Sequence, residues 1–164
     1  YLFFFFFIHS ITKTKASEIA ETIVKSFNIV GLLAVEMFIT NEGETLVNEI
    51  APRPHNSGHH TIEGNFTSQF EQHLRAILNL PLGETEMIMP SIMVNLLGEK
   101  GYEGEAKFTG INDILKIPRV YIHLYGKKYT RSNRKMGHVT ILDESLESGF
   151  NKIKLIKEKV KVIS

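Results

Sequence analysis

The stretch from residue 32 to residue 50 most constrains how this chain can fold. Leu32 to Ile39 is an almost unbroken apolar run, residues 41–43 read Asn-Glu-Gly, and Thr45 to Ile50 again carries Leu, Val and Ile. Two such runs on either side of an Asn/Gly turn signal are typical of paired antiparallel strands. A nearly continuous apolar strand is expected to be buried on both faces. The sequence therefore predicts a β-hairpin whose first strand is buried.

Glu36 is the only charged residue in the first of these runs. A buried carboxylate costs several kcal/mol unless it is paired, protonated or bound to a metal. If residues 42–43 form a two-residue turn, Glu36 lies directly opposite Glu49, with Cβ atoms about 5 Å apart. Facing carboxylates need a cation or a shared proton, and such oxygen ligands suit Mg²⁺ with a phosphate substrate. A longer turn would place Asn48 opposite Glu36; alternatively, Glu36 points to an edge and Glu49 pairs with Arg53.

The second strand runs into a loop, residues 51–60, that is rich in Pro, Gly, Asn and His. Arg53 offers a planar fork for anions, and histidine, here His55, is the side chain suited to proton transfer near neutral pH. Ser57 and Gly58 allow backbone N–H groups to approach a ligand closely. We therefore expect a ligand-binding loop at the carboxyl end of a strand, where open α/β sheets bind their ligands.

The histidines of this loop leave two other interpretations open. His55, His59 and His60 could form a zinc site of a metal-dependent hydrolase, although no helical spacing presents their rings on one face. Alternatively, the loop is simply polar, and its histidines cap backbone groups.

Positive charge gathers towards the C-terminus. From Lys127 onward ten Lys and Arg residues stand against four Asp and Glu residues, although the whole chain has a formal net charge of only +1. Lys127 and Arg134 are seven residues apart across a turn, a spacing that allows two cations to hold one phosphate. The alternative is a solvated edge hairpin protected by charge. Aromatic residues do not alternate with the cations as single-strand binders require, so we do not expect nucleic acid as a partner.

The composition is that of an ordinary globular protein, with 43% hydrophobic and 23% charged residues in a chain of 164. The absence of cysteine excludes disulfides, thiolate catalysis and cysteine-ligated metal sites. The apolar run Tyr1 to Ile8 is far shorter than the roughly 18 residues of a membrane span, and it does not resemble a signal peptide. We therefore expect a cytoplasmic protein with no membrane partner. The run reads best as a buried strand that lacks neighbours, which predicts a C-terminal piece of a longer protein.

Periodicity predicts the remaining elements. Helices are expected over residues 17–27, 68–79, 111–117 and 146–160, and strands over 91–97, 120–125 and 137–142. Ser17 is an expected helix cap, and Ser68 with Glu71 forms a capping box. The stretch from 80 to 90 is the expected boundary between two domains, 1–80 and 88–164.

The string from Asn48 to His60, Asn-Glu-Ile-Ala-Pro-Arg-Pro-His-Asn-Ser-Gly-His-His, carries a family resemblance. Together with Glu36 and with Arg-Lys-Met-Gly-His at 134–138, it resembles the C-terminal part of the 5-(carboxyamino)imidazole ribonucleotide synthetases. These are ATP-grasp enzymes of purine biosynthesis that carboxylate aminoimidazole ribonucleotide with bicarbonate through carboxyphosphate. The resemblance implies an α+β fold: the C-terminal half of an ATP-grasp core over 1–80, with 1–14 poorly matched, and a small mixed α/β C-terminal domain over 88–164.

The same resemblance implies site residues, cofactors and partners. Glu36 and Glu49 match the Mg²⁺-binding carboxylates, and Asn48 with Glu49 matches the pair that contacts ATP. Arg53 and His55 match catalytic residues around the carboxylated amine and carboxyphosphate. Further substrate-binding matches are Asn56, Ser57 and Gly58 in the loop, and Lys127, Arg134 and Lys135 on the ribonucleotide phosphate. ATP, Mg²⁺, bicarbonate, aminoimidazole ribonucleotide and a homodimer are thus implied.

The family's N-terminal nucleotide domain and its ATP-clamping lid have no match in this sequence. The resemblance therefore implies that the 164-residue chain is an incomplete enzyme, inactive by itself. Two functions of other classes remain open beside this one: a non-catalytic module that binds a phosphorylated metabolite, and the metal-dependent hydrolase of the histidine-rich loop.

Overall fold

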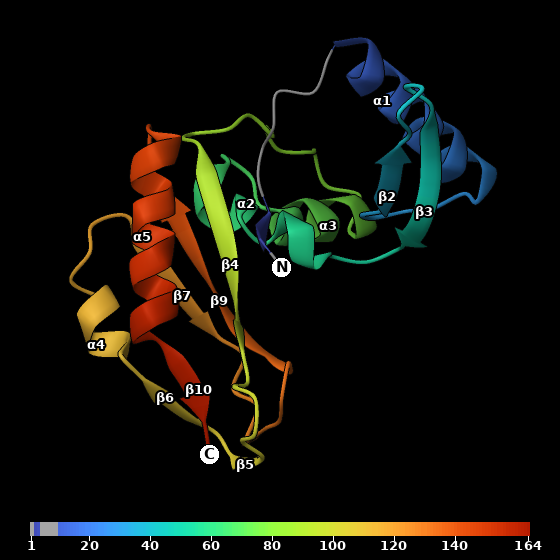
Figure 1. The fold of residues 1–164 in the computed structure, drawn as a ribbon. Helices are drawn as coiled ribbons and strands as arrows, with labels where there is room; N and C mark the ends of the chain where they lie inside the picture. The colour runs from blue at the N-terminus through green and yellow to red at the C-terminus, as the bar shows by residue number, and fades with distance from the viewer. Residues whose placement is uncertain (1, 4–9) are drawn as a thin grey trace. The chain divides into compact units, whose positions relative to one another are not determined.

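A computed structural model describes residues 2–3 and 10–164 of the chain (Figure 1). They divide into two compact units. The hairpin unit comprises the described residues of Phe6–Ile62 and Phe66–Glu86, and the sheet unit those of Tyr1–Phe5, Glu63–Asn65 and Met87–Ser164. Both helices and sheets are present, so the predicted α+β class is confirmed. Of the strand expected over Tyr1–Ile8, only Leu2–Phe3 (β1) lies within the described residues.

In the described residues, the hairpin unit contains four longer elements of regular structure and two short helices. They are α1 (Ser10–Ser26), β2 (Ala34–Ile39), β3 (Thr45–Ala51), the 3₁₀ helix η1 (Asn56–Gly58), the first residues of α2 (Thr61–Gly64), and α3 (Gln69–Ile77). The prediction that Ser17 caps the first helix is wrong, because residues 10–16 contain neither Gly nor Pro and continue the helix. The cap of α3 is confirmed: Ser68 Oγ accepts from the backbone N–H of Glu71 at 3.2 Å.

The turn of the β2–β3 hairpin is one residue longer than expected. Thr40 and Glu44 close it, since the Thr40 N–H donates to the Glu44 carbonyl at 2.9 Å. Gly43 lies between them with φ +81°, and its N–H donates back to the Thr40 carbonyl at 3.0 Å. A three-residue turn whose last residue is left-handed is the usual alternative to the two-residue turn, and glycine suits that position best.

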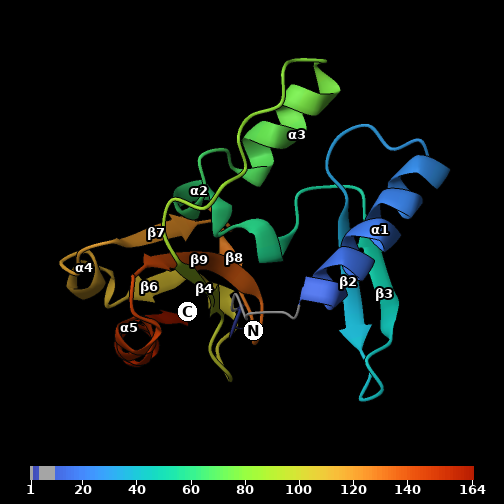
Figure 2. The ribbon, with the colours of Figure 1, turned by 90° about the horizontal axis from the view of Figure 1, so that it is seen from above.

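The expected burial of β2 on both faces is wrong. Glu36, Phe38 and Ile39 are exposed, because among the described residues β2 and β3 pair with each other and with no further strand. Helix α1 lies along this hairpin (Figure 2) and shares one cavity with Val35 and Met37, two of the half-buried residues of β2. One face of the hairpin is therefore covered within this unit, and the side chain of Glu36 belongs to the other.

The sheet unit is built on a four-stranded antiparallel sheet in the order β1-β4-β9-β7. Its strands beyond β1 are β4 (Ser91–Leu97), β7 (Val120–Leu124) and β9 (Lys135–Leu142), all close to their predicted ranges. Helix α5 (Leu146–Lys159) lies along one face (Figure 1). Alternate strand residues pack with this helix in one core, whose members include Ile92, Val94, Val139, Ile141, Ile153 and Ile156.

Four short strands and one short helix complete this unit. They are β5 (Gly104–Glu105), β6 (Lys107–Thr109), α4 (Ile111–Ile114), β8 (Tyr129–Thr130) and β10 (Lys161–Ile163). β10 pairs with β6, and β5 pairs with β8. None of the helices that the structure describes, in either unit, is long and apolar enough to cross a membrane.

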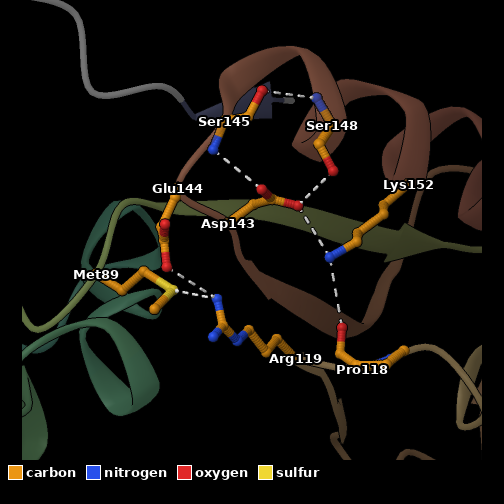
Figure 3. A network of polar contacts seen from close by, with 8 residues as sticks. All are labelled: Met89, Pro118, Arg119, Asp143, Glu144, Ser145, Ser148 and Lys152. Carbon is orange, nitrogen blue, oxygen red and sulfur yellow. Dashed lines mark hydrogen bonds and ion pairs between the residues drawn. The ribbon is translucent and has the colours of Figure 1, made fainter.

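Asp143 anchors the start of α5 (Figure 3). Its carboxylate accepts from the Ser145 N–H at 3.0 Å and from the Ser148 hydroxyl at 2.7 Å, and it pairs with the ammonium of Lys152 at 2.9 Å. The Lys152 contact contributes most to lowering the pKa of Asp143 from 3.8 to about 2, and the bonds from Ser148 and Ser145 follow. Three donors on one carboxylate thus stabilise its charged form.

We expect Asp143→Asn to lower the free energy of unfolding by about 1–2 kcal/mol at neutral pH. A depressed carboxyl pKa stabilises the fold above the unfolded value of 3.8, and this contribution is lost as the pH falls towards 2. Urea unfolding at several pH values should therefore show the two proteins converging between about pH 4 and pH 2. Glu144→Gln, whose exposed carboxylate lies 3.5 Å from Arg119, is the control and should change little. A difference that is constant with pH would contradict the prediction.

Candidate functional site

Glu36 and Glu49 are direct partners across the β2–β3 hairpin. Met37 pairs with Val47, but the next pair is Glu36 with Glu49, so the register skips Asn48 at a β-bulge. The longer turn shifts the pairing by one residue, and the bulge shifts it back. The predicted pairing of the two carboxylates is confirmed, although the two-residue turn from which it was derived is wrong.

The carboxylate of Glu36 is held from two sides. One oxygen, Oε2, accepts from Nδ2 of Asn48 at 3.3 Å, and the other, Oε1, lies 3.3 Å from Nε2 of His55. The Glu36 side chain remains 45% exposed, so a ligand can still reach it. Arg53 donates to the carbonyl of Pro54 at 3.1 Å, and in the described part of the chain no ion pair joins it to Glu49. The alternative in which Arg53 neutralises Glu49 is therefore not what the structure shows.

The ring of His55 is oriented by the turn that follows it. Its Nδ1 lies 2.8 Å from the hydroxyl of Ser57 and 3.4 Å from the backbone N–H of Ser57. An N–H can only donate, so in the neutral ring Nδ1 accepts and the proton is on Nε2. Nε2 is the atom that faces Glu36. The local sequence His-Asn-Ser-Gly thus presents an N–H group of His55 to the carboxylate.

Gln69 fixes the loop, and sequence reasoning missed it. Its side chain is buried, with 7% of the residue exposed. Oε1 accepts from the N–H of His55 at 2.8 Å, Nε2 donates to the carbonyl of His55 at 2.8 Å, and Nε2 also contacts Nδ1 of His59 at 2.8 Å. The amide therefore pairs with the backbone of His55 as a neighbouring strand would. Nothing in the sequence links this first residue of α3 to a loop fourteen residues earlier.

Gly58 leaves the room that Gln69 needs. A Cβ atom on Gly58 would lie 2.5 Å from Oε1 of Gln69. The carbonyl of Gly58 also accepts from the hydroxyl of Thr61 at 2.6 Å, and the same hydroxyl accepts from the N–H of Gln69 at 2.9 Å. The glycine of the loop is thus required for packing within the protein, in addition to any approach of a ligand.

We expect Gly58→Ala to lower the free energy of unfolding by about 1–3 kcal/mol, because the new methyl group displaces a hydrogen-bonded amide. Denaturant unfolding measures this loss. In a Gln69→Ala background the same substitution should cost less than about 1 kcal/mol, since the obstructing side chain is gone. Equal losses in the two backgrounds would show that Gln69 is not the cause.

The other loop histidines have separate surroundings. His59 stacks on Phe70 with ring centroids 5.5 Å apart, and burial lowers the pKa of His60. Among the residues that the structure describes, no three His, Cys, Asp or Glu side chains lie close enough together to hold a metal ion. The structure therefore does not assemble His55, His59 and His60 as a zinc site.

Lys127, Arg134 and Lys135, here called the basic cluster, belong to the sheet unit. Lys127 Nζ donates to the carbonyl of Lys135 at 2.7 Å and lies 5.6 Å from the ring centroid of Tyr125. Arg134 donates to the carbonyl of Tyr129 at 3.0 Å. Backbone carbonyls, which leave the cationic charge unneutralised, thus hold two of the predicted phosphate-binding groups. Lys135 is exposed at the start of β9.

Comparison with known proteins identifies relatives for both units. Residues 7–70 match the ATP-grasp domain family, and residues 91–150 match the phosphoribosylaminoimidazole carboxylase C-terminal domain family. The chloroplastic phosphoribosylaminoimidazole carboxylase of Vigna aconitifolia is 51% identical over 142 residues, which are 84% of this chain and 25% of that protein. The N5-carboxyaminoimidazole ribonucleotide synthase of Bacillus subtilis is 50% identical over 131 residues, 79% of this chain and 33% of that protein.

Solved structures agree with these matches. The N5-carboxyaminoimidazole ribonucleotide synthetase of Thermotoga maritima is 52% identical, with a TM-score of 0.89 over 96% of this chain and 44% of its own. The Aspergillus clavatus enzyme in complex with ADP and 5-aminoimidazole ribonucleotide is 36% identical, with a TM-score of 0.79 over 93% of this chain and 41% of its own. The chain thus spans about a quarter to less than half of the length of these relatives. The predicted match to the C-terminal portion of the ATP-grasp synthetases is confirmed.

Proposed function

Because the chain belongs to the N5-carboxyaminoimidazole ribonucleotide synthase family, of which it spans the C-terminal portion, we propose that it serves an ATP-dependent carboxylation in purine biosynthesis. In this reaction bicarbonate attacks the γ-phosphoryl group of ATP to give carboxyphosphate and ADP. The amine of 5-aminoimidazole ribonucleotide then takes up the carboxyl group and releases phosphate. The observation that best supports the proposal is the assembly of Glu36, Glu49, Asn48 and His55 within a matched ATP-grasp segment.

The carboxylates fit a magnesium site. Glu36 and Glu49 are directly paired, and Glu36 is open to solvent on one side. Mg²⁺ is usually bound by one or two protein carboxylates together with the phosphates of a substrate. A bound Mg²⁺ would neutralise phosphate charge and align the γ-phosphoryl group. Glu36 and Glu49 would hold the ion, and Asn48 with Glu49 would contact ATP.

The loop supplies groups for the second half of the reaction. Arg53 would stabilise negative charge on carboxyphosphate, and its guanidinium is free of carboxylate partners in the described part of the chain. His55 would move a proton between the amine and the departing phosphate. Nδ2 of Asn56 is buried and has no hydrogen-bond partner in the described structure. A buried donor of this kind is costly unless a ligand or water accepts from it, so Asn56 is assigned to the substrate together with Ser57 and Gly58.

Lys127, Arg134 and Lys135 are assigned to the ribonucleotide phosphate. Their charges are not balanced by ion pairs in the described structure, and they lie within the C-terminal domain match. A phosphate monoester carries close to two negative charges at neutral pH and is suited to two or three such donors. By the same family relationship we propose that the complete protein is a cytoplasmic homodimer that also uses bicarbonate.

The proposal is tested with the complete protein encoded by the gene. Purified enzyme should consume ATP only when bicarbonate and 5-aminoimidazole ribonucleotide are both present, and ADP release should match loss of the free amine. Ribonucleotide binding without ATP turnover would instead indicate the binding module. Turnover of other substrates with bound zinc would indicate the hydrolase.

The 164-residue chain by itself should show no carboxylation. Apolar side chains of its hairpin are largely exposed, with Phe38 at 59% and Leu46 at 49%, which is typical of a surface that is covered in a larger domain. Without the remainder of the ATP site, closure and exclusion of water are not possible. ADP release by the purified chain at the rate of the complete enzyme would contradict this expectation.

A further inference from the structure

A row of polar side chains crosses the sheet of the sheet unit on the face opposite α5. In the β4–β9–β7 register, Asn95 pairs with His138, and His138 pairs with His123. Successive strand residues point to opposite faces, and their neighbours Val94, Val139 and Ile122 pack in or against the core under α5. His138 is only 2% exposed. Burying an imidazole costs free energy unless its ring nitrogens find hydrogen-bond partners.

Consecutive contacts connect this row to the basic cluster. The carboxylate of Glu63, a residue of α2 that belongs to the sheet unit, lies 2.6 Å from Nε2 of His123. The rings of His123 and His138 stack with centroids 4.4 Å apart and planes at 15°. Nδ1 of His138 lies 2.9 Å from the hydroxyl of Tyr125, whose ring faces Lys127 Nζ at 5.6 Å. Each member thus restrains the next.

Two hydrogen bonds fix the ends of this row. Burial raises the pKa of Tyr125, and its hydroxyl lies 2.9 Å from Nδ1 of His138, with the donor of that bond set by the tautomer of the imidazole. Glu63 accepts from Nε2 of His123. The Tyr125 ring is therefore fixed by a bond at its hydroxyl end, while its face is left for a cation. An ammonium group within about 6 Å of an aromatic centroid is attracted to that face.

We propose that Tyr125 and His138 are positioning residues for Lys127, and that the Glu63–His123 pair supports His138 from behind. Lys127 is a long, flexible side chain whose ammonium would otherwise sample many rotamers. The Tyr125 ring and the Lys135 carbonyl hold it in one place before a phosphate arrives. Pre-ordering of this kind improves affinity by reducing the entropy lost on binding. The inference rests on the proposed function, because it takes Lys127 as a phosphate-binding residue.

The neighbouring lysine provides a matched control. Lys128 Nζ lies 5.5 Å from the ring centroid of Tyr129, so it makes the same type of contact one residue further on. Tyr129 is 55% exposed, and its hydroxyl has no bond to the buried histidines among the contacts of the described residues. Of these two lysine–tyrosine pairs, the Lys127–Tyr125 pair is therefore the one connected to the interior of the sheet unit.

The test is a double-mutant cycle on the complete enzyme, with calorimetric titration of 5-aminoimidazole ribonucleotide. Tyr125→Leu should weaken ribonucleotide binding about fivefold and leave the ATP dissociation constant unchanged. In a Lys127→Ala background it should have no further effect, whereas in a Lys128→Ala background the fivefold loss should persist. Tyr125→Phe removes only the hydroxyl and should weaken ribonucleotide binding about twofold to threefold, again only when Lys127 is present. This second variant keeps the test valid if Tyr125→Leu does not fold.

The outcomes separate this inference from the proposed function. If Lys127→Ala does not weaken ribonucleotide binding, the assignment of Lys127 to the phosphate is wrong and the inference is overturned with it. Lys127→Ala could weaken ribonucleotide binding while the Tyr125 variants lower the affinity by the same factor with and without Lys127. Tyr125 would then have only a structural role. If neither Tyr125 variant changes the affinity, the positioning role alone is overturned.

Discussion

Glu36→Gln and Glu49→Gln should each lower kcat of the complete enzyme by about a hundredfold to a thousandfold. Each substitution keeps the size of the side chain and removes one negative charge from the paired carboxylates of the hairpin. A Mg²⁺–ATP complex would then lose a ligand at the point where charge develops during phosphoryl transfer. Initial rates at saturating ATP and increasing Mg²⁺ measure the effect, and excess Mg²⁺ should recover part of the lost rate.

Glu44→Gln is the matched control for this pair. Glu44 is an exposed residue in the turn of the same hairpin, and its backbone carbonyl, which the substitution leaves in place, closes the turn. Its kcat should stay within about twofold of the wild-type value. The affinity for 5-aminoimidazole ribonucleotide should be unaffected in Glu49→Gln and Glu44→Gln, because that ligand is assigned to other residues. A fall in kcat of less than about tenfold for both Glu36→Gln and Glu49→Gln would remove the magnesium assignment.

Arg134→Ala should weaken ribonucleotide binding about tenfold to a hundredfold, because it removes a charge-assisted contact worth roughly 1.5–3 kcal/mol. ATP binding should be nearly unchanged, since ATP is assigned to Asn48 and Glu49. Isothermal titration of both ligands decides the question. Arg131→Ala, an exposed cation in the same connection between β8 and β9, is the control and should leave both affinities unaltered. Equal losses of affinity for both ligands, or no loss for the ribonucleotide, would favour the alternative that the basic cluster is only a solvated, charged edge.

Local signals in the sequence were the most reliable. The Ser68 cap involves only residues within one turn of helix, and the structure contains its hydrogen bond to Glu71. The strands over 91–97, 120–125 and 137–142 have the β-branched and apolar residues that favour extended structure, and they were found within a few residues. The start of helix α1 was predicted seven residues too late, whereas its end was predicted within one residue, because a serine in mid-helix has the same appearance as a capping serine.

The features that could not be predicted depend on contacts between residues far apart in the sequence. The short strands β5, β6, β8 and β10 are two or three residues long and exist only through pairing with distant partners. Gln69 is polar and lies at the start of a helix, so its burial against the backbone of His55 has no periodic signature. The burial of β2 was overestimated because its apolar sequence does not show how many strands pair with it. In the described residues β2 pairs with β3 alone, so one of its faces stays exposed.

The bulge beside Glu36 has a consequence for how adjacent residues share a task. Neighbours on a regular strand point to opposite sides of the sheet. If β3 were regular, Asn48 and Glu49 could therefore not both contact one ligand. A bulge sets two consecutive residues against a single partner. Here Glu49 is the register partner of Glu36, while the amide of Asn48 still reaches the carboxylate of Glu36 at 3.3 Å. In this hairpin the bulge thus turns two consecutive residues, Asn48 and Glu49, towards the same carboxylate, which an unbroken strand would not allow.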